Sequence, residues 1–347
     1  MIPNPDGPVF QTFPLGPQWP VIDPFLFAAH HRDDYPESDG HLGPAPSLAG
    51  RQIGNDFSGD DGWSMYHGLQ VPGFPQHPHR GFETVTHIRF GLVDHADSLG
   101  ATARFGPGDT QWMTAGSGIQ HSEMFPLIDT DLDNPLEMFQ IWLNLPADDK
   151  MVDPYFTMMW REQTPQVNAL CDQPTYTEIT VIAGQLGPAH PNPPPPNSWA
   201  ANPDSDVAIW HIQMGRNASW TLPAASGPNT HRVLYLYDGD MLTLTDDCTI
   251  GESTGAIVDA NKELLLRAGS DGAFIIMLQG RPLGEPIAQR GPFVMNTEEQ
   301  LVTAFQEYRA TQFGGWPWSS PDPTHGDTPQ RFAIHADGTR EVPDEFV

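Results

Sequence analysis

Four side chains that can bind a metal stand in two short pairs in this chain. His77 and His79 are separated by one residue, and so are His121 and Glu123. Because residues i and i+2 of a strand point to the same face, each pair can present two ligands side by side. If the two strands face each other, three imidazole nitrogens and one carboxylate converge. This donor set suits a divalent first-row transition metal, whereas calcium and magnesium prefer shells of oxygen alone.

Chance is the competing explanation for each pair taken alone. The chain contains 14 histidines, so one His-x-His pair can occur without any ligand role. The coincidence of His-x-His with His-x-Glu, each beside a Gly/Pro turn, favours the metal site. His211 and His231 have no such neighbour, and lone histidines in strands are more often structural. We therefore expect no metal in the second half of the chain.

The elements that would position these residues are short strands. The chain has 37 prolines and 33 glycines, about a fifth of its residues, which argues against a mostly helical protein. Beyond about residue 63, apolar runs alternate with turn signals up to Pro146. A second series of such runs extends from about residue 177 to 280. This spacing predicts an all-β fold with antiparallel sandwiches or barrels.

The two series of strands predict two domains of similar architecture. Residues 147–154 (ADDKMVDP) separate the series and form a good linker candidate. We expect an N-terminal domain over 1–150 and a C-terminal domain over 151–347. The letters of the two halves barely repeat, so the duplication is one of architecture.

Other segments have distinct compositions. They are a Pro-rich arm over 1–20 with little expected regular structure, an acidic insert over 30–62 that reads as surface loops, a Pro-rich loop over 187–206 that we expect to be exposed, and an irregular tail after residue 315.

One helix is predicted near the end of the chain. Thr297 and Gln300 form a capping box, in which both side chains satisfy exposed amide groups. Leu301, Phe305 and Tyr308 follow at helical spacing, and a Gly-Gly pair at 314–315 would end the helix.

Several motifs together resemble the pirin family of the cupin superfamily. The resemblance implies a bicupin: two antiparallel jelly-roll β-barrel domains with a short C-terminal helix, and a metal only in the first domain. It also implies that the ligands are His77, His79, His121 and Glu123, the four residues reached from strand geometry. The motifs are HPHRGFETVTH (77–87), DSLG (97–100), GPGDTQWMTAGSGIQHSEM (106–124), IWLNLPADDKM (141–151), GPFVMNTEEQ (291–300) and FGGWP (313–317).

The chain also departs from the family pattern. His87 and Arg89 are unusual where a hydrophobic strand normally ends in an acidic residue before glycine, and they either alter the pocket or face solvent. Glu83 shares strand parity with the two histidines of the first pair, and cupins often use a glutamate near that position. In pirin-like chains the carboxylate ligand is Glu123 instead, so we favour a hydrogen-bonding role for Glu83.

The resemblance implies quercetin 2,3-dioxygenase activity, with a small aromatic substrate and O2 as reactants. Glu123 would act as the general base that accepts the proton of the flavonol 3-hydroxyl. Candidate pocket residues are Phe82, Glu83, Trp112 and Met113, for which ordinary core packing is an equal alternative. The resemblance ranks Fe(II) first as the metal, whereas the donor set also allows Mn, Ni, Co or Cu.

Two alternative functions belong to other classes. One is a redox-responsive, iron-binding regulator that acts through protein partners without turnover. The other is a metal-binding protein with no reaction at all. Loss of flavonol absorbance in air separates the dioxygenase from both.

Composition excludes several further classes. The chain has 16 basic and 44 acidic residues, a formal net charge of −28, so its field repels nucleic acids. No run of 18 apolar residues predicts a membrane span, and no signal peptide is visible at the start. Cys171 and Cys248 are expected to be unrelated buried thiols in a reducing compartment. We therefore expect a cytoplasmic monomer, and the excess of acid suggests adaptation to high salt.

Overall fold

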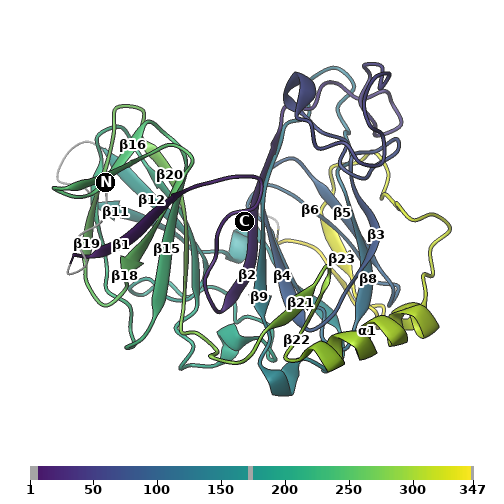
Figure 1. Ribbon diagram of the computed structural model, residues 1–347. Helices are drawn as coiled ribbons and strands as arrows, with labels where there is room; N and C mark the ends of the chain where they lie inside the picture. Colours follow the sequence, from purple (N-terminus) through teal and green to yellow (C-terminus); the bar gives the residue numbers. More distant parts are fainter. Residues whose placement is uncertain (1–6, 171–174, 345–347) are drawn as a thin grey trace. The chain divides into compact units, whose positions relative to one another are not determined.

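The computed structural model describes residues 7–170 and 175–344. Within these residues the protein is built mainly from short strands, with one α-helix (Figure 1). The mostly β prediction is confirmed, while closure of the sheets into barrels stays a prediction. In the described part of the chain, no helix is both long enough and apolar enough to cross a membrane.

The chain forms two compact units, each of which draws on separate segments of sequence. Unit 1 contains the chain up to Ala29, Trp142–Asn144 and Gln163–Gly284. Unit 2 contains His30–Ile141, Leu145–Glu162 and the chain from Glu285 on. The division of the chain into domains at 1–150 and 151–347 stays a prediction.

Unit 1 contains a seven-stranded sheet and a four-stranded sheet. The first has the order β1 (Val9–Pro14), β18 (Thr254–Asp259), β15 (His231–Asp238), β20 (Ala273–Gly280), β13 (Ala208–Met214), β12 (Tyr176–Ala183) and β11 (Gln166–Leu170). The second has the order β14 (Ser219–Leu222), β19 (Leu264–Ala268), β16 (Met241–Thr245) and β17 (Cys248–Gly251).

The two sheets of unit 1 enclose one hydrophobic core. Trp210, Leu234 and Met277 come from the seven-stranded sheet, and Leu242 and Leu266 come from the four-stranded sheet. These residues are spaced two apart from other buried residues of their strands, which is the alternation expected when one sheet face is buried.

Two other large sheets belong mainly to unit 2, although residues 25–29 and 142–144 of their strands belong to unit 1. The five-stranded sheet has the order β10 (Tyr155–Met159), β7 (Thr110–Thr114), β4 (Phe82–Phe90), β9 (Leu136–Asn144) and β2 (Phe25–Asp33). The six-stranded sheet has the order β24 (Arg340–Glu341), β23 (Phe332–Ile334), β6 (Thr102–Phe105), β5 (Val93–Asp97), β8 (Ile119–Met124) and β3 (Gly73–His79).

The core of unit 2 lies between these two sheets. Ile88, Met113 and Met138 project from the five-stranded sheet, and Phe105 and Ile119 project from the six-stranded sheet. All five are fully buried. The side chains of β8 therefore lie in a water-poor interior, whereas most residues of β3 are only partly buried.

The remaining elements are a hairpin, the helix and short turns. The hairpin joins β21 (Ala288–Arg290) to β22 (Phe293–Met295), and helix α1 (Glu298–Thr311) follows it. The predicted capping box is confirmed, since Thr297 and Gln300 bond each other's backbone amides. Short 3-10 turns lie at Asp60–Gly62, Ala147–Asp149, Arg161–Gln163, Trp199–Ala201 and Gln312–Gly314.

Three segments have more structure than the sequence predicts. The expected irregular arm contains β1, whose Val9 pairs with Val258 of β18. The expected irregular tail contains β23, which pairs with β6. The predicted linker packs into unit 2, where the buried Lys150 donates to the Gly81 carbonyl at 2.8 Å. β1 and β23 pair with strands that are far away in sequence, and local patterns do not reveal such pairing.

Candidate metal centre

Strand register brings the two predicted ligand pairs together in unit 2. In the antiparallel pair of β3 and β8, His77 lies opposite His121, and His79 lies opposite Ile119. A glycine turn at Gly81 then leads from β3 into β4. The His-x-His and His-x-Glu pairs therefore occupy neighbouring strands of one sheet, rather than strands that face each other.

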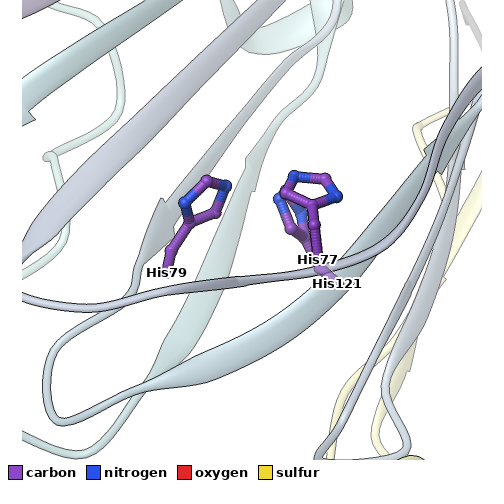
Figure 2. Close-up of side chains that lie close together, drawn as sticks. All are labelled: His77, His79 and His121. Atoms are coloured by element: carbon purple, nitrogen blue, oxygen red, sulfur yellow. The ribbon is translucent and has the colours of Figure 1, made fainter. Parts of the chain in front are cut away.

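Three imidazoles converge at this point. The ligand atoms of His77, His79 and His121 all lie within 4.8 Å of one another. Their rings stand at an angle to each other, and Figure 2 shows the His77 ring above that of His121, with His79 to one side. His79 and His121 are buried, whereas His77 is partly exposed. This arrangement can hold one metal ion with a side open to solvent or substrate.

The electrostatics keep these imidazoles neutral, the form in which histidine binds a metal. Burial lowers the pKa of His77 to about 4. Burial, followed by the nearby imidazoles, lowers the pKa of His79 and of His121 well below the usual range. A neutral imidazole keeps a nitrogen lone pair available as a ligand at neutral pH.

Hydrogen bonds also fit a bound metal. His77 donates from Nδ1 to the Pro75 carbonyl at 2.9 Å, which leaves Nε2 as the ligand atom. Both ring nitrogens of His121 are buried, and neither has a hydrogen-bond partner among the described residues. An unpaired buried nitrogen costs free energy, and a metal ion would satisfy it.

Glu123 lies beside the histidines and is held from the opposite sheet. Its Oε2 is 3.9 Å from Nε2 of His121. Thr86 of β4 donates to Oε1 at 2.9 Å, and Gln140 of β9 donates to Oε2 at 2.7 Å. Burial raises the pKa of the Glu123 carboxyl, while these two donors act against the rise. A buried, oriented carboxylate of this kind can complete a metal site or accept a proton.

Two models of protein families match the sequence of this chain. The family model for pirin matches residues 9–143, and the model for the pirin C-terminal cupin domain matches residues 209–314. The chain belongs to the pirin family. It therefore has two cupin-type domains, and the resemblance noted from its motifs is confirmed.

Individual relatives agree with this assignment. A Pseudomonas aeruginosa protein with a provisional quercetin 2,3-dioxygenase name is 36% identical over 246 residues, which cover 70% of this chain and 80% of that protein. Human pirin is 31% identical over 261 residues, 72% of this chain and 80% of its own length. The solved structure of quercetin 2,3-dioxygenase from Acinetobacter baumannii has the same fold, with a TM-score of 0.68 at 24% identity, and covers 88% of this chain and 98% of that one.

The candidate pocket residues fall on two different faces of the five-stranded sheet. Thr86 points towards Glu123, so the alternation of β4 and its register with β7 place Phe82 and Met113 on that same inner face. The Phe82 ring centroid is 5.1 Å from that of His79. Glu83 and Trp112 are buried on the other face, where Thr114 donates to Glu83 at 2.8 Å. The structure therefore brings only two of the four towards the histidines.

The two residues that depart from the pirin pattern also lie away from the centre. His87 alternates with Thr86, so it projects from the outer face of β4, where its Nδ1 lies 2.8 Å from Thr110 Oγ1. Arg89 pairs with Glu137 at 3.1 Å. Neither side chain alters the ligand set.

Sequence reasoning missed three residues around the site. Besides Thr86 and Gln140, the fully buried His95 of β5 lies opposite Glu123 across the strand pair. Its ring centroid is 5.5 Å from that of His121, and its Nε2 is 3.3 Å from Asp97. The signal in the sequence was a third spaced pair, His95-x-Asp97, which ends on the first residue of the motif at 97–100.

His211 and His231 of unit 1, for which we expected no ligand role, have protein partners. Nε2 of His211 lies 2.7 Å from the Tyr237 hydroxyl, and Nδ1 of His231 lies 3.1 Å from the Asp23 carbonyl. Both cysteines were predicted to be buried thiols. Cys248 is a free thiol that is only half-buried, and Cys171 lies outside the described residues.

Proposed function

We propose that this pirin is a metal-dependent dioxygenase that opens the C-ring of a flavonol such as quercetin. The convergence of His77, His79 and His121 carries the proposal, because three neutral imidazoles on rigid strands suit a redox-active transition metal. The provisional dioxygenase name of the Pseudomonas relative supports the choice of reaction. The net reaction consumes one O2 and releases carbon monoxide.

In this proposal the metal, Fe(II) in first place, supplies Lewis acidity and electron transfer to O2. The three histidines would hold it, with Glu123 as the proposed fourth ligand. Because burial raises the pKa of Glu123, this carboxylate accepts a proton more readily than one in water. It would take the proton of the flavonol 3-hydroxyl at Oε1 or Oε2, while Thr86 and Gln140 keep the carboxylate oriented.

The experiment follows the absorbance of quercetin in air with iron-loaded protein, together with carbon monoxide release. We expect turnover by the wild type and a loss of ~100-fold or more in Glu123→Gln, the usual size of general-base catalysis. Glu137→Gln is the matched control, since this carboxyl is also buried in unit 2 but pairs with His30 and Arg89. A fully metallated wild type that leaves quercetin unchanged would contradict the proposal and favour a role without turnover.

A further inference from the structure

A large cavity in unit 1 has no part in the proposed reaction. It has a volume of about 560 Å³ and is lined only by residues of 184–281. Volumes of ~300–1,000 Å³ are typical of sites for small organic molecules. The cavity lies at one end of the seven-stranded sheet, where Ala208 of β13, Arg232 of β15 and Gln279 of β20 are neighbours, so that two of these three strands end in a polar side chain. Its walls therefore consist of apolar side chains from the core of unit 1 and a small set of polar side chains.

The first unusual member of that set is Arg232 on β15. Its side chain is 1% exposed, and it faces the interior like Leu234 two residues further on. The guanidinium donates to the Gln279 side chain and, at 2.8 Å, to the Pro223 carbonyl. No carboxylate of the described chain lies within ion-pair distance of it. Burial lowers the pKa of Arg232 to about 10, although the negative charges of Asp206 and Asp259 act against this shift.

Two other donors of the cavity wall, unlike those of Arg232, are unsatisfied. Nε of Arg281 and Nε1 of Trp210 are buried, and neither has a hydrogen-bond partner among the described residues. Trp210 is 3% exposed. Gly227 backs onto the Arg281 guanidinium so closely that a Cβ at this position would overlap Nη2. The cavity wall thus contains one buried guanidinium without a carboxylate partner, that of Arg232, and two buried donors without an acceptor among the described residues, Nε of Arg281 and Nε1 of Trp210.

The acidic residues of the cavity do not neutralise these cations directly. Asp206 accepts from the Thr230 hydroxyl at 2.8 Å and from the Gly227 amide at 3.1 Å, which ties the two neighbouring loops together. Asp204 is exposed at the rim. The missing partner is therefore an acceptor with negative charge and a planar pair of oxygens, the shape that a guanidinium binds best.

We propose that this cavity of unit 1 binds a small organic acid, whose carboxylate is held by Arg232 and Arg281. Its apolar body lies along Leu186, Val207 and Trp210, which also line the cavity. The site is separate from the three histidines of unit 2 and does not depend on the proposed dioxygenase activity.

The test is calorimetric titration of the full-length, metal-loaded protein with 2-naphthoate, an aromatic acid that fits the volume. We expect saturable binding, with 2-naphthamide, its uncharged isostere, binding at least tenfold more weakly. Arg281→Gln should weaken 2-naphthoate binding by roughly tenfold or more, because it removes a charge-assisted hydrogen bond. Gly227→Ala should also weaken binding, since it displaces the same guanidinium without changing the charge.

Two controls locate the binding site. Arg267→Gln removes an exposed arginine of unit 1 outside the cavity and should leave binding unchanged. His77→Ala, which disrupts the candidate metal centre, should also leave it unchanged. Thermal unfolding of each variant checks that it folds. Equal binding by wild type and Arg281→Gln, loss of binding in His77→Ala, or binding of inorganic phosphate in place of 2-naphthoate would each overturn the proposal.

Discussion

At the scale of single residues, burial determines the protonation state of the groups in unit 2. Desolvation keeps the histidines neutral and makes the Glu123 carboxyl easier to protonate. The two donors to Glu123 come from β4 and β9, and they fix its orientation from the opposite sheet. The same physical effect acts on His87, which lies outside the centre and can be tested without disturbing it.

His87 gives a prediction for the pH dependence of stability. Burial lowers its pKa in the folded protein to about 4, below the value of 6.5 that is usual for histidine. Between pH 6.5 and pH 4 the unfolded chain binds more protons than the folded protein. The contribution of His87 to the free energy of unfolding is therefore fully present above pH 6.5 and is lost as the pH falls towards 4. The difference between these two pKa values corresponds to about 3 kcal/mol in the free energy of unfolding. In His87→Gln this contribution is absent, so the variant should gain stability relative to the wild type as the pH falls.

Urea unfolding of both metal-free proteins at several pH values from 7 to 4.5 measures this effect. Other buried histidines titrate in both proteins, and their contribution cancels in the difference. A difference in unfolding free energy that stays constant over this range would show that His87 is not buried in its neutral form.

Residue types and spacing were enough to predict the ligand histidines and Glu123 as candidates. The supporting residues were not predictable, because Thr86 and Gln140 reach Glu123 across the gap between two sheets. Their positions depend on which strands face each other, and a single sequence does not specify that. The same limit applies to Glu83 and Trp112, which the sequence predicts as pocket residues together with Phe82 and Met113. Strand alternation puts Glu83 and Trp112 on the opposite face of the five-stranded sheet.

At the scale of elements, turns with fixed backbone geometry hold the ligand strands in register. Local signals predicted the N-terminal helix cap, since it depends on neighbouring residues alone. The predicted end of the helix at the 314–315 Gly-Gly pair is wrong, because α1 ends at Thr311 and Gln312 adopts the left-handed conformation at its C-cap. Local signals did not predict β1 or β23, whose partners are more than 200 residues away. The turn between β3 and β4 matters most for the site, because His79 lies two residues before Gly81.

Gly81→Ala should destabilise the protein and lower its metal content. Gly81 has φ +83°, and an added Cβ would overlap the Val294 carbonyl oxygen. Gly100 is the matched control, with φ +84° and open space around it. Gly100→Ala should cost only the ~1–2 kcal/mol of the left-handed backbone. Gly81→Ala should cost a further ~1–3 kcal/mol from the overlap.

Chemical denaturation and metal analysis of the two glycine variants provide the measurement. Equal losses of stability in the two variants would mean that the tight approach of Gly81 to β22 is not a constraint on the fold.

At the scale of the whole molecule, the net charge of −28 remains the dominant property. Acidic side chains such as Asp60 and Asp61 are exposed, as the composition of the 30–62 insert suggested. Asp33 and Asp56 of the same insert are buried, however, and Arg51 pairs with Asp56 at 2.9 Å. The insert is therefore partly packed, and repulsion arises from its exposed acids and from those elsewhere on the surface.

Salt should stabilise the protein because it screens this repulsion. The Debye length falls from ~10 Å at 0.1 M to ~3 Å at 1 M salt. We expect the melting temperature to rise from low to molar KCl and then to level off. Thermal unfolding followed by circular dichroism measures the change. A flat or falling melting temperature would remove the proposal of adaptation to high salt.

The central claim is that one transition metal is bound by His77, His79 and His121. Elemental analysis of the purified protein after iron loading and removal of free metal tests it most directly, with wild type, His121→Ala and His211→Ala compared. We expect about one metal per chain in the wild type and in His211→Ala, where the histidine lies in unit 1, and almost none in His121→Ala. Undiminished metal in a folded His121→Ala protein would contradict it.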